Sequence, residues 1–384
     1  MGEWLEKRMD EIADFNPRES IQKGATAKKI AMDKLQPFCR DVPGYEMEAF
    51  SGGTKFRNGD TIMARITPCL ENGKTAKVDV LDEEEVGFGS TEYIVFRAKE
   101  GNDPDFIYYL VTSPVVREPA IKSMVGSSGR QRVQTDVVQG LKVRVPDLEG
   151  QQAIASVLKV LDDKIAANRK VNENLLQQAQ ALYKDRFVDL NPFDGEIPMD
   201  WHLGTVSEII ELHDSKRIPL SSRERANLAK IYPYYGATSV MDYVDRYLFD
   251  GIYLLLAEDG TVVDSKGFPI LQYVEGKFWV NNHAHIITGK NGFTVETLYL
   301  LFSLTNVQSI VTGAVQLKIS QANLNKVSVV IPSEAELSAF NSIVQPIFAQ
   351  IRNLRAENDR LAATRDTLLP RLMSGELDVS SIDF

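Results

Sequence analysis

The chain has 384 residues, 43% of them hydrophobic and 25% charged, and a formal net charge of −10. This composition is typical of a soluble globular protein with two or three domains. The acidic balance makes nucleic-acid binding less expected without excluding it, because net charge sums over the whole surface. Neither a membrane-spanning run nor a secretory signal is found, and Cys39 and Cys69 form no metal-type pair. We therefore expect a cytoplasmic protein.

The first block, residues 1–148, has the pattern of a mixed α/β domain. Strand-like runs occur at Thr61–Ile66 and Tyr93–Arg97, and a short helix is predicted for Asp105–Thr112 behind Pro104. A glycine-rich loop at Gly126–Gly129 precedes Arg130-Gln131-Arg132. The alternating strand Leu141–Val145 then ends at Pro146, where a long helix begins.

The second block, residues 199–334, repeats this order after a turn-rich linker at Asn191–Gly195. The strand Gly251–Leu256 stands where Thr61–Ile66 stood. The loop Thr312–Lys318 again precedes an alternating strand, Val327–Ile331, which ends at Pro332. Pro332 follows Pro146 by 186 residues. A period this long indicates a duplicated domain rather than a solenoid repeat.

Each block leads into a long helix, predicted for Gln151–Phe187 and Leu337–Met373. Apolar residues recur at steps of four and three, which is the spacing of a coiled-coil seam. The two seams superimpose at the offset of 186, which also carries Asn172 onto Asn358. Pro346 predicts a kink in the second helix. The predicted helix-pairing residues are Ile154, Leu158, Leu161, Ile165, Asn172, Leu175, Leu182, Phe340, Val344, Ile347, Ile351, Asn358, Leu361 and Leu368.

These patterns predict an α+β fold in which two pseudo-repeated α/β domains are joined by two long paired helices in a coiled coil. The predicted boundaries are a first domain at 1–148, a central helix at 149–190, a linker at 191–198, a second domain at 199–334, a C-terminal helix at 335–375 and a tail at 376–384.

No sequence motif indicates catalysis. The chain contains neither a phosphate-binding P-loop nor a Gly-x-Ser-x-Gly elbow. Asn191-Pro192-Phe193 differs from the Asn-Pro-Pro-aromatic loop of amino-methyltransferases and sits in a linker, so we interpret it as a turn. His283 and His285 share one face of a strand, but no further Cys or His completes a metal site. We expect no catalytic residues and no metal.

Binding is the remaining interpretation, because basic residues occur in or near loops of both blocks. Arginine forks can read guanine edges and phosphates, and glycine-rich backbone can approach a phosphate chain closely. The basic residues after the glycine loops occupy equivalent points in both halves. The predicted DNA-binding residues are Lys28, Lys29, Lys55, Arg57, Arg65, Arg130, Arg132, Lys216, Arg217 and Lys318.

The duplicated blocks, each followed by a helix of equal length, resemble the specificity subunit of type I restriction–modification systems. The strings that carry the resemblance are Trp4, Phe56–Ile62, Ser90–Tyr93, Pro146–Leu148 with Gln151–Ile154, Ile197–Trp201, Asn282–His285 and Leu368–Leu377. The family often has Glu-Gln at the helix entry, where this chain has Gln151-Gln152 and Leu337-Ser338.

The resemblance implies a non-catalytic subunit whose two recognition domains each read half of a split, asymmetric double-stranded DNA target. Two adenine-methyltransferase subunits would dock on the paired helices, and ATP-dependent restriction subunits would join them. S-adenosylmethionine, ATP and Mg are expected on those partners only, and no membrane is expected as a partner. The two long helices, each about 55 Å long at 1.5 Å per residue, would lie antiparallel and act as a ruler between half-sites. The alternatives are a self-contained DNA methyltransferase and a coiled-coil scaffold without DNA affinity.

Overall fold

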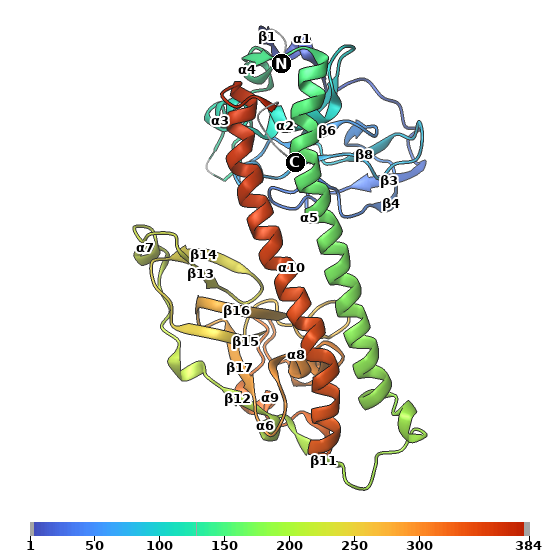
Figure 1. Ribbon diagram of the computed structural model, residues 1–384, viewed down its shortest axis with the longest axis vertical. Coiled ribbons are helices and arrows are strands. Elements are labelled where there is room, and N and C mark those ends of the chain that lie inside the picture. Colours follow the sequence, from blue (N-terminus) through green and yellow to red (C-terminus); the bar gives the residue numbers. More distant parts are fainter. Residues whose placement is uncertain (1–3, 128, 380–384) are drawn as a thin grey trace. The chain divides into compact units, whose positions relative to one another are not determined.

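The computed structural model describes residues 4–127 and 129–379, which form two compact units (Figure 1). Unit 1 combines the chain up to Lys170 with the chain from Arg355 onward, and unit 2 is Val171–Leu354. Each unit therefore contains one α/β block and a segment of each long helix. The following description takes the units one at a time.

The block of unit 1 is built on two four-stranded sheets and a two-stranded ribbon. The sheet orders are β2-β9-β6-β7 and β4-β3-β8-β5, and β1 pairs with β10 in the ribbon. The strands are β1 (Leu5–Arg8), β2 (Ala13–Phe15), β3 (Thr26–Ile30), β4 (Glu46–Ala49), β5 (Thr54–Phe56), β6 (Thr61–Ala64), β7 (Thr75–Lys77), β8 (Gly87–Gly89), β9 (Tyr93–Ala98) and β10 (Lys142–Val145). The helices are α1 (Met9–Ile12), α2 (Pro104–Thr112), α3 (Pro114–Lys122) and α4 (Thr135–Gln139).

The block of unit 2 has one six-stranded sheet in the order β12-β17-β15-β16-β13-β14, together with the ribbon β11-β18. The strands are β11 (His202–Thr205), β12 (Ile210–Leu212), β13 (Tyr232–Tyr235), β14 (Val240–Val244), β15 (Phe249–Ala257), β16 (Leu271–Val280), β17 (Ala284–Gly289) and β18 (Ser328–Ile331). The helices are α6 (Val206–Ile209), α7 (Ser222–Arg225), α8 (Val295–Ser303) and α9 (Gln321–Leu324).

The two blocks share one topology, which confirms the predicted duplication. In both, a short ribbon pairs the first strand with the strand before the long helix, β1 with β10 and β11 with β18. In both, a parallel pair attaches an outer hairpin to the sheet, β3 to β8 and β13 to β16. The long strands β15 and β16 of unit 2 correspond to the broken pairs β5/β6 and β7/β8 of unit 1. The predicted fold class is confirmed.

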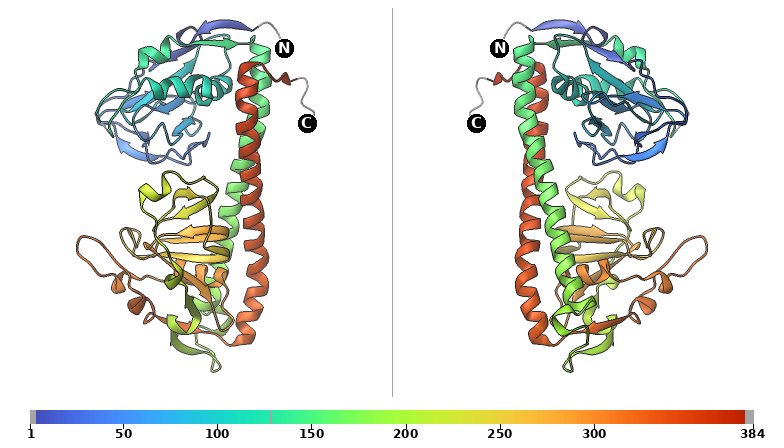
Figure 2. Two further views of the ribbon diagram at one scale, coloured as in Figure 1. Left: turned by 90° about the vertical axis from the view of Figure 1, so that its left-hand side faces the viewer. Right: turned by 90° about the vertical axis from the view of Figure 1, so that its right-hand side faces the viewer.

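The long helices are α5 (Leu148–Tyr183), continued by a π-helical turn at Lys184–Val188, and α10 (Glu334–Ser374). Within unit 1 they run antiparallel, because Asp162 contacts Arg365 while Asn168, further along α5, contacts Asn358. Within unit 2, Tyr183 packs on Phe340, and Arg186, further along α5, pairs with Glu336, which comes earlier in α10. The two helices are therefore antiparallel in this unit as well. Figure 2 shows the α/β block of each unit against its own pair of helix segments. α10 runs through Pro346 as one helix, and the predicted kink stays a prediction.

The helix segments are part of the hydrophobic core of each unit. In unit 1, Ile154 and Leu158 of α5 and Leu372 of α10 are fully buried in one cluster with α2. In unit 2, Ala179 of α5 and Val344 of α10 are likewise buried with α8. Burial of this apolar stripe stabilises the helices, at roughly 25 cal/mol per Å² of apolar surface removed from water.

One predicted seam position is wrong. The Leu182 side chain is 41% exposed, whereas Tyr183, the next residue, is buried and packs on Phe340 with ring centroids 5.7 Å apart. A straight α-helix drifts by about 20° per heptad relative to a strict 3.5-residue repeat, so the buried stripe moves by one residue near the helix end. The other predicted seam residues are buried or partly buried.

The polar position in the seam of unit 1 is a side-chain pair. Asn168 is buried, and its Nδ2 donates hydrogen bonds to Asn358 Oδ1 at 2.9 Å and Glu357 Oε2 at 3.0 Å. Asn358 is one of the predicted helix-pairing residues, whereas Asn168 is not among them. A buried amide favours the one register in which it is paired, and this pairing fits that role.

Candidate nucleic-acid interface

The loop after α3 in unit 1 is a short hairpin closed by Val125 and Arg132. The backbone N–H of each donates to the carbonyl of the other, at 3.0 and 2.9 Å. Inside it, the Arg130 N–H donates to Ser127 O at 3.0 Å. Gly126 has φ +135°, and a Cβ there would lie 3.0 Å from Arg130 O, so the tight turn needs glycine. We name residues 125–132 hairpin 1.

Unit 2 has the same structure at residues 312–318, which we name hairpin 2. Thr312 and Lys318 exchange two backbone hydrogen bonds of 2.8 Å. Gly313 has φ +93°, and a Cβ there would lie 2.1 Å from Gln316 O. Hairpin 2 is one residue shorter than hairpin 1 in the sequence.

Both hairpins are held on the main sheet by an identical bond pattern. In unit 1, Thr67 N–H donates to Gln131 O and Val133 N–H to Arg65 O. In unit 2, Gly260 N–H donates to Leu317 O and Ile319 N–H to Glu258 O. Arg132 and Lys318, predicted as equivalent basic residues, therefore occupy the same structural position.

The basic residue at the base of each hairpin is neutralised by a carboxylate. The Arg132 guanidinium lies 2.7–2.9 Å from Glu92, and this bonding holds the pKa of the Glu92 carboxyl below its ordinary value. Lys318 Nζ lies 3.2 Å from Glu258 Oε1. Burial alone would raise the pKa of Glu258, but Arg217, His285 and Lys318 lower it below its ordinary value. These cations brace the hairpins.

The exposed tips carry different side chains. Arg130 is exposed, and its guanidinium makes no ion pair or hydrogen bond within the described part of the chain. In hairpin 2, Gln316 is exposed and Val315 is fully exposed. A glycine loop with an accessible arginine or amide can approach DNA bases and backbone closely.

Two of the predicted DNA-binding residues are inside the domains instead. Lys28 is 7% exposed, and its Nζ lies 3.0 Å from Asp82 and 2.8 Å from Glu85. The Arg217 side chain, 14% exposed, bonds to Glu258 at 2.6 Å. A buried cation needs an anionic partner, and these cations have theirs within the domain. The burial of Lys28 contradicts a direct contact with DNA, and the partly buried Arg217 is held by Glu258.

The remaining predicted basic residues are accessible to different degrees. The Arg65 guanidinium donates to the carbonyl of Val133, the residue that follows hairpin 1. Of these remaining basic residues, only Lys216 is exposed, and it has no carboxylate partner among the described residues. Its Nζ lies 3.5 Å from His213 Nδ1. The others are Lys29, which pairs with Glu48, Lys55, which donates to Glu19 O, and Arg57, which pairs with Glu19.

A buried polar cluster lies beneath hairpin 2. Asp214, Glu258 and His285 bring one ligand atom each within 4.8 Å of the others. His285 Nδ1 is 2.6 Å from Asp214 Oδ2, and Nε2 donates to Ile319 O at 2.8 Å. Gln321 also donates to Asp214. Because each ligand atom already has a partner in the protein, the cluster fits an ion network that fixes the hairpin base.

Sequence reasoning noticed His285 but missed its partner. Asp214 lies 71 residues away, and its carboxylate accepts bonds from His285, Gln321 and the Ile286 N–H. Burial raises the pKa of the Asp214 carboxyl, but these hydrogen bonds lower it below its ordinary value. The available signal was an acidic residue two positions after the short strand β12, which alone is too common to identify a partner.

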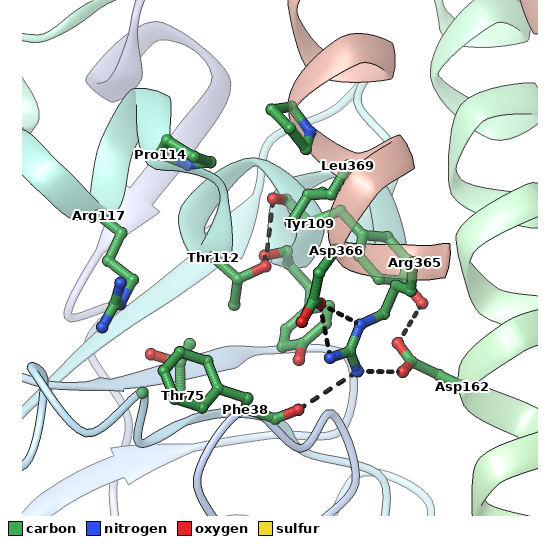
Figure 3. Close-up of a pocket in the computed structure, with 13 residues that line it drawn as sticks. Phe38, Thr75, Tyr109, Thr112, Pro114, Arg117, Asp162, Arg365, Asp366 and Leu369 are labelled. Carbon is green, nitrogen blue, oxygen red and sulfur yellow. Dashed lines mark hydrogen bonds and ion pairs between the residues drawn. The ribbon is translucent and has the colours of Figure 1, made fainter. Parts of the chain in front are cut away.

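A pocket of about 170 Å³ opens in unit 1 between α2, α3 and the end of α10 (Figure 3). Its inner end holds Asp162 and Arg365, which bond to each other at 2.7 Å. Tyr109 Oη donates to Asp162 at 2.8 Å, and Arg365 also bonds to Asp366. Because these groups satisfy one another, they form a structural ion pair beside the pocket.

No helix in the described parts of the chain is both long and apolar enough to cross a membrane.

The sequence matches the family described as type I restriction modification DNA specificity domain over residues 1–177 and again over 198–362. The MjaIX specificity subunit of Methanocaldococcus jannaschii is 26% identical over 312 residues, covering 74% of this chain and 71% of the relative. The HindI specificity subunit of Haemophilus influenzae is 23% identical over 421 residues, covering 88% and 89%. A type I restriction–modification S subunit from M. genitalium has a similar fold, with TM-score 0.51 and 17% identity over 97% of this chain and 96% of the other.

The two matched stretches together cover most of the chain. The chain therefore belongs to the type I restriction–modification DNA specificity family. Its function is that of a specificity subunit of such a system, and neither a self-contained methyltransferase nor a plain scaffold is favoured.

Proposed function

We propose that this subunit reads a bipartite, asymmetric double-stranded DNA target, one half-site with each unit. The observation that carries the proposal is the pair of hairpins, which have the same backbone bonds and different exposed side chains. Identical scaffolds with different tips are what a reader of two different sequences needs, because bases are distinguished by side chains in the major groove. Residues 125–132 and 312–318 are the proposed contact segments.

We further propose that the subunit is not catalytic and directs partner subunits. Two adenine-methyltransferase subunits would carry S-adenosylmethionine, and restriction subunits would use ATP and Mg. The complex would act on DNA in the cytoplasm. The family match supports this division of work, because it is a match to a DNA specificity domain in both halves of the chain.

The paired helices are the proposed docking platform and ruler. α5 and α10 each contribute to both units, so both blocks are joined through helix rather than through loop alone. A helix has a defined rise of about 1.5 Å per residue, which suits it to set a distance between half-sites. The repeated offset of 186 residues would offer each methyltransferase subunit an equivalent face.

The proposal is tested by producing the chain with its cognate methyltransferase subunits and mapping methylated adenines in a plasmid library of random sequence. We expect one recurring motif with two separated parts. Methylation without a recurring motif would contradict the proposal. Binding of S-adenosylmethionine by the isolated chain would instead favour the self-contained methyltransferase. Footprinting without sequence preference in the presence of the methyltransferase would favour the scaffold.

A further inference from the structure

We propose that Arg130 and Gln316 are equivalent base-reading residues, Arg130 reading a guanine in one half-site and Gln316 an adenine in the other. This inference rests on the proposed function and adds which side chains read and what they select. Its starting point is that both residues occupy one position in a repeated hairpin.

The backbone establishes the equivalence. Arg130 and Gln316 each stand two residues before the closing basic residue, Arg132 or Lys318. The carbonyl of each packs against the hairpin glycine. A Cβ on Gly126 would lie 3.0 Å from Arg130 O, and a Cβ on Gly313 would lie 2.1 Å from Gln316 O. The residue that follows each accepts the backbone bond that holds the hairpin on the sheet.

Arg130 has a fixed backbone and an uncommitted side chain. Its N–H donates to Ser127 O at 3.0 Å, and its carbonyl lies 3.4 Å from Arg132 Nη1. The guanidinium is exposed and has no partner among the described residues. Because the backbone of this side chain is already held, binding has to order only the rotamers of the side chain and not the loop.

Hairpin 2 presents a neutral amide at the corresponding point. Gln316 is exposed, and its amide has no hydrogen bond within the described chain. The preceding residue, Val315, is fully exposed, where hairpin 1 has Gly129. A fully exposed valine on a hairpin tip gains from contact with an apolar partner, and the methyl group of thymine in the major groove is one.

The charges around both hairpins favour base contact over phosphate contact. The nearest cations, Arg132 and Lys318, are already paired with Glu92 and Glu258. A phosphate approaching either pair would meet a carboxylate, and Gln316 has no charge to offer a phosphate. In the major groove, arginine bonds bidentately to guanine O6 and N7, and glutamine to adenine N6 and N7.

The test exchanges the two side chains in the complex with the methyltransferase subunits. Arg130→Gln should change one position of one half-site from guanine toward adenine, and Gln316→Arg should make the opposite change in the other half-site. Each preference should shift on the order of ten- to hundred-fold, as expected for one bidentate base contact. Val315→Gly should weaken the preference for the A·T pair several-fold.

Matched measurements keep the outcome decisive. Lys122→Gln, on a residue whose side chain is 77% exposed at the end of α3, is the charge-loss control and should leave the motif unchanged. Unaltered thermal unfolding and co-purification would show that the variants fold and assemble, and Arg130→Ala and Gln316→Ala provide a second pair that should lose preference without gaining another.

A bipartite wild-type motif that Arg130→Gln and Gln316→Arg both leave unchanged would overturn the inference while the proposed function stands. Uniformly weaker methylation of the same motif, with a smaller salt dependence, would identify phosphate contacts and would also overturn it. Absence of any motif with the wild-type chain would instead be the failure of the proposed function.

Discussion

Units 1 and 2 share a backbone plan but place the buried ion pair at different positions of the junction between block and helices. In unit 1 the junction holds the ion pair of Asp162 and Arg365, beside the pocket. In unit 2 the positions 186 residues away hold Phe348 and Ala179, and Phe348 packs on Tyr273 with ring centroids 5.2 Å apart. The ion pair of unit 2 lies elsewhere on α10, where Arg352 bonds to Glu296 at 3.0 Å and to the Tyr273 hydroxyl at 2.5 Å. The repeated topology therefore accommodates either an ion pair or apolar residues at these two positions.

The largest expected effect comes from breaking the ion pair on one side. Arg365→Ala should destabilise unit 1 by about 3–5 kcal/mol, because it leaves the Asp162 carboxylate buried without its charge partner. Adding Asp162→Phe copies the unit 2 solution and should restore most of that loss. Chemical denaturation of the three chains checks both statements. A double variant as unstable as Arg365→Ala would show that the two junctions are not interchangeable.

The reverse experiment addresses unit 2. Phe348→Ala should cost about 3 kcal/mol, because it removes a fully buried ring and leaves a cavity against Tyr273 and Tyr299. Phe348→Leu, which keeps most of the apolar volume, is the matched control and should cost less. Unfolding curves monitored by a probe in each unit would locate the loss. Equal stability of Phe348→Ala and wild type would contradict tight packing at this junction.

The larger pH-dependent contribution is expected beneath hairpin 2, because the Asp214 carboxyl is buried whereas the Glu92 carboxyl beneath hairpin 1 is partly exposed. The folded pKa of Asp214 lies below the ordinary value of 3.8, so its contribution is present above about pH 4 and is lost as the pH falls through the folded pKa. Asp214→Asn should cost about 1–3 kcal/mol at neutral pH and flatten the loss of stability in acid. The measurement is the free energy of unfolding as a function of pH. An unchanged slope would remove Asp214 from the network.

The smallest change in stability is expected at the base of hairpin 1. Glu92→Gln removes a partly exposed ion pair and should alter stability by less than about 1 kcal/mol. It also releases Arg132, which should raise affinity for non-specific DNA and steepen its salt dependence by about one charge. Titration of the assembled complex with random DNA at several salt concentrations checks this. A weaker affinity for non-specific DNA would mean that Glu92 does more than hold Arg132.

The features that could be predicted from the sequence are those that repeat locally. The helices, their pairing and the equivalence of Arg132 with Lys318 all follow from periodicity and a constant offset. The errors arise where a side chain's partner is distant in sequence. Lys28 pairs with Asp82, which is 54 residues further along the chain, so nothing in the local sequence indicated that Lys28 is buried.

The misplaced seam position has a different cause. Leu182 and Tyr183 are both apolar neighbours on a helix, and a heptad count chooses between them only if the helix follows a 3.5-residue period to its end. The π-helical turn begins only at Lys184, after both residues, so the drift from a 3.5-residue period accounts for the shift. The sequence located both hairpins. It could not show that Arg132 is paired with Glu92 while the Arg130 guanidinium has no partner among the described residues, because both facts depend on the folded structure.

The division of both helices between the units has a consequence for the order in which the chain folds. Unit 2 is one continuous segment, Val171–Leu354, and its core can be completed as soon as that segment has been synthesised. The core of unit 1 includes Leu369, Leu372 and Met373, so the first block to leave the ribosome lacks part of its interior until nearly the whole chain exists. During translation the second unit can therefore reach its native state before the first, and truncation near the C-terminus will damage the N-terminal domain.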